Sequence, residues 1–328
     1  MREIREDNRR SARVFTNPLI RSGLALFCCL LWGSAFPCVK IGYEWLSISD
    51  TGSQVLFAGY RFFLAGVFTF ILGYALERRW MLPQKSSFPA LLGQAVLQTT
   101  LQYIFFYIGM AHTTGVKGSV INASNAFISI IAAHFLMKGE RITWSKTVGC
   151  LVGFAGVIAV NLEPAASGAW SSGFSFLGEG MIFLCSAVYG VSSVTLKMIS
   201  HRETPVGITA WQLLIGSSIL IAVGLLLGGE IRGFSLSSVL LLLYMALLST
   251  VAFSLWSILL KYNSVGEIAV FGFSIPVFGS LLSAVILGET LFSVKNFFAL
   301  LLVAAGIIIV NGTFAGKDRR NALSDAEK

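Results

Sequence analysis

The sequence predicts an all-α integral membrane protein with ten transmembrane helices, arranged as two inverted five-helix repeats. Composition is the first observation: 55% of the 328 residues are hydrophobic and 12% are charged, whereas a soluble domain carries about 25% charged residues. The second is a set of ten apolar segments, each near the roughly 20 residues that a bilayer span needs. The third is that related segments recur in the same order in both halves of the chain.

The repeat is clearest toward the end of each half, in residues 136–161 and 285–311. Both segments contain a Gly-Glu pair, a lysine and a closing asparagine: Gly139-Glu140 matches Gly288-Glu289, Lys146 matches Lys295, and Asn161 matches Asn311. Near the start of each half, 28–40 aligns with 185–197, which pairs Cys28 with Cys185, Trp32 with Tyr189 and Lys40 with Lys197. A duplicated helical bundle is a recurring plan of secondary transporters, which bind their substrate between the halves.

The apolar segments place the ten spans in order along the chain. They cover residues 22–42, 53–76, 88–110, 116–137, 143–162, 174–198, 205–228, 235–260, 265–287 and 293–313. The connections between them are short, so the sequence leaves no room for an additional soluble domain.

The basic residues predict the orientation of these spans, because loops on the cytoplasmic side of a membrane are rich in Lys and Arg. With the N-terminus inside, inner segments hold 19 of the 24 Lys and Arg residues, outer segments hold four, and Arg61 lies within a span. We therefore expect both termini to be cytoplasmic. Because each repeat has five spans, an odd number, the second repeat enters the membrane from the opposite side and is inverted relative to the first. The predicted units are a basic tail (1–21), the first repeat (22–162), an outer linker (163–173), the second repeat (174–313) and a C-terminal tail (314–328).

Arg61, in the middle of the second span, is the strongest candidate for a substrate-binding residue. An arginine at that depth costs roughly 2.5–3.5 kcal/mol on insertion scales, so it must face a cavity or a partner. The functional interpretation is that Arg61 attracts a carboxylate or another anion. The alternative is a structural arginine, hydrogen-bonded to helix-end carbonyls or a nearby carboxylate.

Side-chain amides follow on the third and fourth spans. Gln94, Gln98 and Gln102 recur every four residues, which places them on one stripe of an α-helix. Asn122 and Asn125 share a face of the fourth span. Amides both donate and accept hydrogen bonds, so the two stripes either line a wet path or bind each other and hold the helices together.

Aromatic and small residues carry the remaining candidates. Trp32 and Tyr189 occupy matching positions of the repeat at mid-depth, and Trp and Tyr usually prefer the membrane interface. We predict that they bind an apolar or aromatic part of a substrate; packing is the alternative. Trp211, Gln212 and Trp256 are further candidates on the seventh and eighth spans. Pro276, in the ninth span, is either a hinge or a static kink, and the fourth span has no proline to match it.

Several of these motifs together resemble the EamA-type transporters of the drug/metabolite transporter superfamily. They are LLWGSAFPCVK (30–40), GYRFFLAG (59–66) with its arginine, and the Gly-Glu pairs followed by glycines and a closing Val-Asn. The resemblance covers about residues 22–313 and implies a ten-helix, inverted-repeat exporter or permease with a central cavity. It does not imply one substrate. Arg61 and Pro276 have no counterparts in the opposite repeat, so the halves are not expected to line the cavity equivalently.

The sequence contains no residues for an intramembrane enzyme, because no span carries an aspartate pair, a His-Glu-x-x-His zinc site or a nucleophile with a base. We therefore expect no enzyme activity, no metal and no cofactor. The net charge of +8 lies in loops and tails, which favours membrane topology over nucleic-acid binding. The predicted function is transport, as an exporter of amino acids or related zwitterionic or anionic compounds in the cytoplasmic membrane, by alternating access. Permeation of amphipathic drugs or other metabolites is the alternative, and a receptor or scaffold is a third. Monomer and homodimer are both left open.

Overall fold

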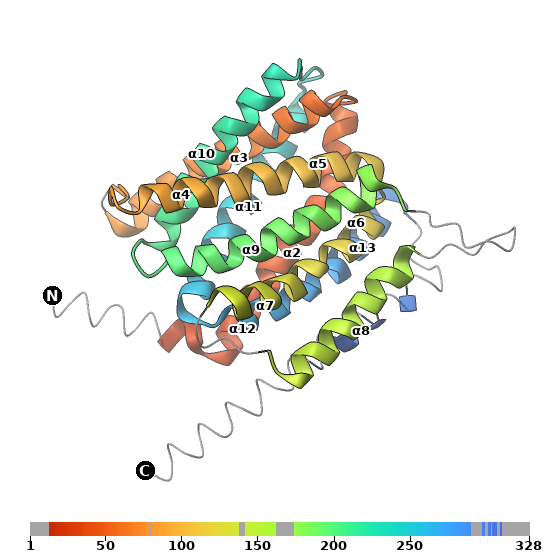
Figure 1. Cartoon of the computed structure of the whole chain (residues 1–328). Helices are drawn as coiled ribbons and strands as arrows, with labels where there is room; N and C mark the ends of the chain where they lie inside the picture. Colours follow the sequence, from red (N-terminus) through yellow and green to blue (C-terminus); the bar gives the residue numbers. More distant parts are fainter. Residues whose placement is uncertain are drawn as a thin grey trace, which may run out of the picture.

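A computed structural model describes residues 13–78, 80–137, 142–161, 174–289, 297–298, 301–302, 304–306 and 309. Every regular element in these residues is helical (Figure 1). The α-helices are α2 (Pro18–Trp45), α3 (Thr51–Glu77), α4 (Phe88–Gln94), α5 (Gln102–His112), α6 (Gly115–Asn122), α7 (Ser124–Leu136), α8 (Trp144–Asn161), α9 (Met181–Ile199), α10 (Pro205–Leu226), α11 (Leu236–Tyr262), α12 (Val265–Ala269) and α13 (Ser274–Leu287). Three short segments have other helical geometry: the π-helices η1 (Ala95–Leu101) and η2 (Phe176–Gly180), and the 3₁₀ helix η3 (Val270–Phe273).

Seven helical stretches among the described residues are long and apolar enough to cross a membrane. They are 18–45, 51–75, 115–136, 176–199, 205–226, 236–262 and 265–287. The protein is therefore a multi-pass membrane protein. Two further predicted spans are helical, one as the succession α4, η1 and α5 and one as α8. The tenth predicted span, 293–313, falls largely outside the described residues.

Polar residues at the helix starts explain where the apolar runs become helices. Asn17, Asp50, Thr204 and Ser235 each accept a hydrogen bond from a backbone N–H of the first turn, which satisfies one of the donors that a helix start leaves without a partner. Pro18 and Pro205 occupy first-turn positions, where proline has no hydrogen bond to lose.

Small residues determine the closest pair of helices, α3 and α10, which run antiparallel. Gly52, Gly59 and Gly66 recur every seven residues along α3; Gly59 and Gly66 face α10, and Gly52 faces the turn that follows it. A Cβ atom at Gly59 would lie 2.7 Å from the side chain of Ile221, and one at Gly66 would lie 2.8 Å from that of Leu214. Membrane helices associate by such close packing, because lipid gives them no hydrophobic driving force to associate.

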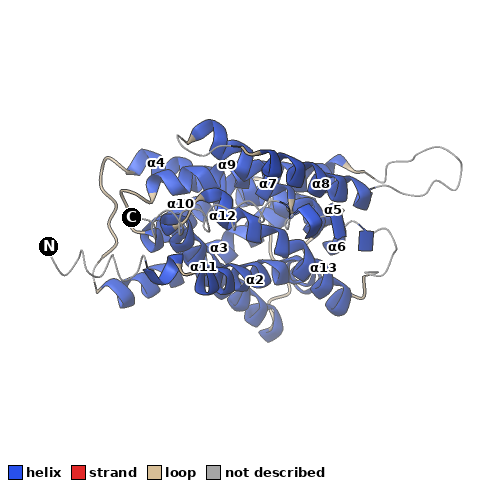
Figure 2. Ribbon diagram, turned by 90° about the horizontal axis from the view of Figure 1, so that it is seen from below, coloured by secondary structure: helices blue, strands red, loops and turns tan. Residues whose placement is uncertain are grey.

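Most of the other helices form two outer layers around α3, α5, α6 and α12 (Figure 2). One layer contains α11, α2 and α13, in which α2 contacts both neighbours. The opposite layer contains α9, α7 and α8, in which α7 contacts both neighbours. The layers place α2 opposite α9, and the space between these two helices contains the candidate site.

The connecting segments meet in two groups, one at each end of the bundle. At one end, Ser53 Oγ donates to the carbonyl of Glu230 at 2.7 Å, joining the first turn of α3 to the loop that precedes α11. At the other end, the N–H of Gln84 donates to Glu203 Oε1 at 2.9 Å. The sequence assigns the first pair of segments to the outer side and the second pair to the inner side.

Two of the long helices are interrupted near their middle. The fourth span breaks between α6 and α7, at Ala123. The ninth span changes from α12 through η3 to α13. Pro276 is the third residue of α13, and it has no N–H to donate to the carbonyl of Gly272. Pro276 therefore lies just after an existing break, and the fourth span also has a break although it has no proline there.

Candidate substrate site

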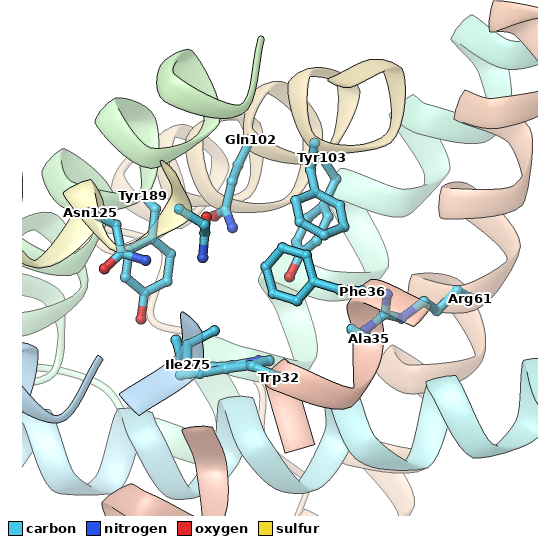
Figure 3. Close-up of a pocket in the computed structure, with 11 residues that line it drawn as sticks. Trp32, Ala35, Phe36, Arg61, Gln102, Tyr103, Asn125, Tyr189 and Ile275 are labelled. Atoms are coloured by element: carbon cyan, nitrogen blue, oxygen red, sulfur yellow. The ribbon is translucent and has the colours of Figure 1, made fainter. Parts of the chain in front are cut away.

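Side chains from seven helices converge on a central cavity of about 40 Å³ (Figure 3). Its lining comprises Trp32, Ala35 and Phe36 of α2, Arg61 of α3, Gln102, Tyr103 and Phe106 of α5, Asn122 of α6, Asn125 of α7, Tyr189 of α9 and Ile275 of α13. An adjoining small cavity shares Asn125, Tyr189 and Ile275 and adds Trp256. The larger cavity has room for roughly three water molecules, so an organic substrate requires it to widen.

Arg61 lies at one end of this group, and Asn125 and Tyr189 lie at the other (Figure 3). The guanidinium is almost fully buried. Its Nε donates to Ser249 Oγ at 3.1 Å and to the Met245 carbonyl at 3.2 Å, and its Nη1 donates to Tyr107 Oη at 3.2 Å. These bonds use two of the five N–H donors of an arginine.

The charge of Arg61 has no carboxylate partner within 4.0 Å in the part of the chain that the structure describes. The nearby ring of Phe62, whose centroid is 4.7 Å from the guanidinium carbon, gives a weaker cation–π contact. The cavity thus carries a net positive charge. Both interpretations of Arg61 keep support, because the carbonyl and hydroxyl bonds suit a structural role and the uncompensated charge suits an anion.

Trp32 lies at the centre of an aromatic group between the two layers. Its ring centroid lies 4.9 Å from that of Trp256, 5.5 Å from Phe253 and 6.2 Å from Tyr189, all in edge-to-face arrangements. The repeat therefore places Trp32 and Tyr189 in contact. Together with Trp256 they give the cavity an apolar, aromatic wall.

Three buried polar atoms of the lining have no hydrogen-bond partner among the described residues. They are the indole Nε1 of Trp32, the hydroxyl of Tyr189 and the amide Oε1 of Gln102. A buried polar group without a partner costs free energy. These three atoms therefore indicate where a polar ligand or water would bind.

The glutamine stripe of the third span does not form as predicted. The π-helical turns of η1 alter the angle between successive residues, and neither Gln94 nor Gln98 lines the cavity. The Gln94 amide donates to the Gln98 side chain and to the Ser192 carbonyl, and it accepts from Thr195. Only Gln102 lines the cavity; Gln94 holds α4 against α9, and Gln98 bonds to Gln94.

The structure also places Trp211 and Gln212 away from the central cavity. The indole N–H of Trp211 donates to the Met81 carbonyl at 2.7 Å, beside a separate polar cavity of about 280 Å³ near the loops around Gln84 and Glu203. Gln212 is buried on α10 and lines none of these cavities. Helix α10 packs behind α3 and η1, so it contributes no side chain to the central cavity.

Some lining residues gave no signal in the sequence. Phe36, Phe106 and Ile275 are ordinary apolar residues of a span, and only their position in the fold brings them to the cavity. Tyr107 was recognisable as a mid-span hydroxyl, but its contact with Arg61 depends on how α3 and α5 pack. No group of His, Cys, Asp or Glu side chains that could hold a metal ion is found in the described residues.

A multi-pass helical bundle around a buried polar cavity is the arrangement of a membrane transporter. The family model of the EamA-like transporter family matches the chain twice, over residues 21–162 and 176–312. The chain therefore belongs to the EamA-like transporter family, which confirms the resemblance seen in its motifs.

Curated relatives carry the same kind of name. An "Uncharacterized transporter" of Archaeoglobus fulgidus is 25% identical over 85% of this chain and 94% of its own. A "Probable amino-acid metabolite efflux pump" of Salmonella typhimurium is 26% identical over 88% of this chain and 94% of its own. A solved crystal structure, 19% identical, superposes with a TM-score of 0.69 over 88% of this chain and 94% of that one, which shows a shared fold.

Proposed function

We propose that this transporter exports a small metabolite bearing a carboxylate, such as an amino acid or a related organic acid, through the central cavity. Arg61 carries the proposal, because it brings a buried positive charge to the cavity and no described carboxylate neutralises it. A substrate carboxylate would supply the missing negative charge. The guanidinium keeps three N–H donors for it, and charge-assisted bonds from arginine to carboxylate are strong.

The rest of the cavity suits the remainder of such a molecule. Trp32, Tyr189 and Trp256 would contact an apolar or aromatic side chain. Gln102, Asn122 and Asn125 offer amide oxygens to an ammonium or hydroxyl group. The name of the Salmonella typhimurium relative supports both the amino-acid class and the outward direction. The aromatic wall would also suit an amphipathic drug, so such compounds belong in the same assay.

We further propose that ten spans form two inverted repeats. One repeat would rock against the other around the cavity, so that the cavity opens alternately to the two sides of the membrane. The pairing of helices supports this arrangement. α2 of the first half contacts α13 and α11 of the second, and α9 of the second half contacts α7 and α5 of the first. The repeat relates α2 to α9, α13 to α7 and α11 to α5. The contacts of α2 with α13 and α11 therefore correspond to those of α9 with α7 and α5, as an internal two-fold axis requires.

The proposed orientation, with both termini in the cytoplasm of a cell-membrane protein, can be tested with two cysteines. Ser86 is an exposed residue of a predicted inner loop, and Ser237 is an exposed residue at the outer end of the predicted eighth span. In a background without the five native cysteines, an impermeant thiol reagent should label S237C in intact cells and S86C only after lysis. Labelling of S86C in intact cells would contradict the orientation.

The substrate proposal can be tested by comparing metabolites in cells and medium with and without overproduction of the protein. We expect carboxylate-bearing compounds to rise in the medium and fall in the cells, and R61Q to abolish the change at equal protein level in the membrane. Enrichment of neutral or cationic amphipathic compounds instead would favour the drug permease. Equal export by R61Q would assign Arg61 to structure.

A further inference from the structure

We infer that two equivalent clusters, one at each end of the bundle, hold the central cavity shut and act in turn as the gates of the transport cycle. The outer cluster is Glu179, Thr113 and Lys117, and the inner cluster is Arg21, Asn263 and Glu267. This inference rests on the proposed inverted repeats but not on the identity of the substrate.

In the outer cluster, Glu179 at the start of the sixth span reaches the turn between α5 and α6. Thr113 Oγ1 donates to Glu179 Oε1 at 2.7 Å, and Lys117 Nζ lies 4.0 Å from the same oxygen. The Glu179 side chain is 4% exposed and that of Lys117 is 20% exposed. The carboxylate thus links the beginning of α9 to the beginning of α6 in a region with little water.

In the inner cluster, Arg21 near the start of α2 reaches the turn between α11 and α12. Its Nη1 donates to Asn263 Oδ1 at 3.5 Å and lies 3.7 Å from Glu267 Oε1. Both charged side chains are largely buried, at 15% and 21% exposed. The guanidinium thus links the beginning of α2 to the beginning of α12.

The two clusters occupy corresponding positions of the repeat. Asn263 and Glu267 follow Thr113 and Lys117 by 150 positions, within the spacing of 149–150 that relates the later helices of the halves. Thr113 and Asn263 are the C-cap residues of α5 and α11. The first spans are related by a spacing of 157, from Cys28 to Cys185, which places the counterpart of Arg21 next to Glu179.

The charges of the two clusters are reversed. In the outer cluster, the residue at the start of a repeat's first span is the acid, Glu179, and the residue at the start of a fourth span is the base, Lys117. In the inner cluster, the residue at the start of the first span is the base, Arg21, and the residue at the start of a fourth span is the acid, Glu267. Each cluster is therefore complementary within itself.

The position of the clusters explains how they control access. α2 and α9 contribute Trp32 and Tyr189 to the cavity, and α6 and α12 begin the two interrupted helices beside it. The cavity is too small for an organic substrate, so one end must open to admit it. Opening the outer end separates the starts of α9 and α6, and opening the inner end separates those of α2 and α12. Loss of one cluster should therefore favour the state that is open at that end.

A cysteine in the cavity wall can report which end is open. Ala35 lines the cavity and is 5% exposed, so A35C, in a background without the five native cysteines, serves as the reporter. A charged, impermeant thiol reagent is applied outside intact cells and, separately, to inside-out vesicles. E179Q should raise the labelling rate from outside about fivefold, and R21Q should lower it while raising labelling in inside-out vesicles about fivefold, as expected for pairs of this strength.

K117Q removes the basic residue of the outer cluster, and it gives a second measurement if E179Q folds poorly. The charge-exchanged doubles E179K/K117E and R21E/E267R should restore labelling toward the original rates. E230Q is the matched control, because Glu230 forms a 2.6 Å pair with Arg232 that is exposed and confined to one loop; its labelling should not change.

Opposite effects of the two single variants would establish the gates, since general loosening of the bundle would raise labelling from both sides. A single variant that changes the labelling rate of A35C equally from both sides would overturn the inference. An unchanged labelling rate in K117Q or in R21Q would also overturn it. The assay uses no substrate, so its outcome is independent of whether the transported molecule carries a carboxylate.

Discussion

Replacing Arg61 with glutamine removes the cavity's positive charge while keeping a polar side chain of similar reach. Three of the five N–H donors remain for a ligand after the bonds to Met245, Ser249 and Tyr107. A hydrogen bond to a charged group contributes about 1.5–3 kcal/mol. We therefore expect R61Q to weaken binding of a carboxylate substrate by about 10-fold to 150-fold.

The neutral amide analogue of the same substrate should lose much less, about fivefold or less, because it forms only neutral hydrogen bonds worth about 1 kcal/mol. R61K should lie between R61Q and the unchanged protein, since lysine keeps the charge but loses the planar guanidinium. Y107F is the matched control, because it removes one hydrogen bond of Arg61 and leaves the charge in place. Binding of both ligands to purified protein gives the comparison.

Equal weakening of the carboxylate and its amide by R61Q would refute the reasoning. Loss of folded protein in R61Q, with Y107F equally unstable, would instead assign Arg61 to the structural network with Met245 and Ser249. Thermal unfolding of each variant without ligand separates these two outcomes.

Three further predictions concern motion and stability. P276A restores a backbone donor at the break of the ninth span, so transport into proteoliposomes should slow severalfold while substrate affinity stays unchanged; a normal rate would remove the hinge. Hydrogen bonds from the Ser53 hydroxyl and backbone N–H lower the pKa of the Asp50 carboxyl. The ionised Asp50 cap therefore stabilises the fold at pH values above the ordinary pKa of an aspartate, and this stabilisation is lost as the pH falls through the lowered pKa. The melting temperature should therefore fall more for the unchanged protein than for D50N between pH 5 and pH 3. G59A places a Cβ 2.7 Å from Ile221 and should cost about 1–3 kcal/mol, whereas G93A meets nothing within 4 Å and should not destabilise; equal melting temperatures would contradict the close packing of α3 and α10.

Local chemistry made much of the fold predictable. Apolar runs placed the long helices, although α2 begins at Pro18, four residues before the predicted span, because Asn17 caps an additional helical turn. Arg61 could be singled out because a charge in a span needs a partner wherever the helix packs. Trp32 and Tyr189 could be paired because the repeat aligns them, and the structure brings their rings together.

The errors arose where the backbone leaves α-helical geometry or where packing decides. A stripe of every fourth residue assumes an α-helix, so the π-helix η1 separates Gln98 from Gln102. The break at Ala123 has no proline to announce it, so the fourth span seemed continuous. Trp211 and Gln212 stand where Arg61 would have its counterpart, but α10 lies behind α3 because of the glycines along their interface. That interface depends on both helices, so neither helix predicts it alone.

Transport by the purified protein in liposomes tests the central claim most directly. Proteoliposomes preloaded with an unlabelled amino acid or related organic acid should take up the same labelled compound in exchange, with a rate that saturates with concentration. We predict saturable exchange of a carboxylate-bearing metabolite that R61Q abolishes, at equal protein incorporation. Exchange of carboxylates no faster than in empty liposomes, across compounds that the cells are shown to export, would contradict the account.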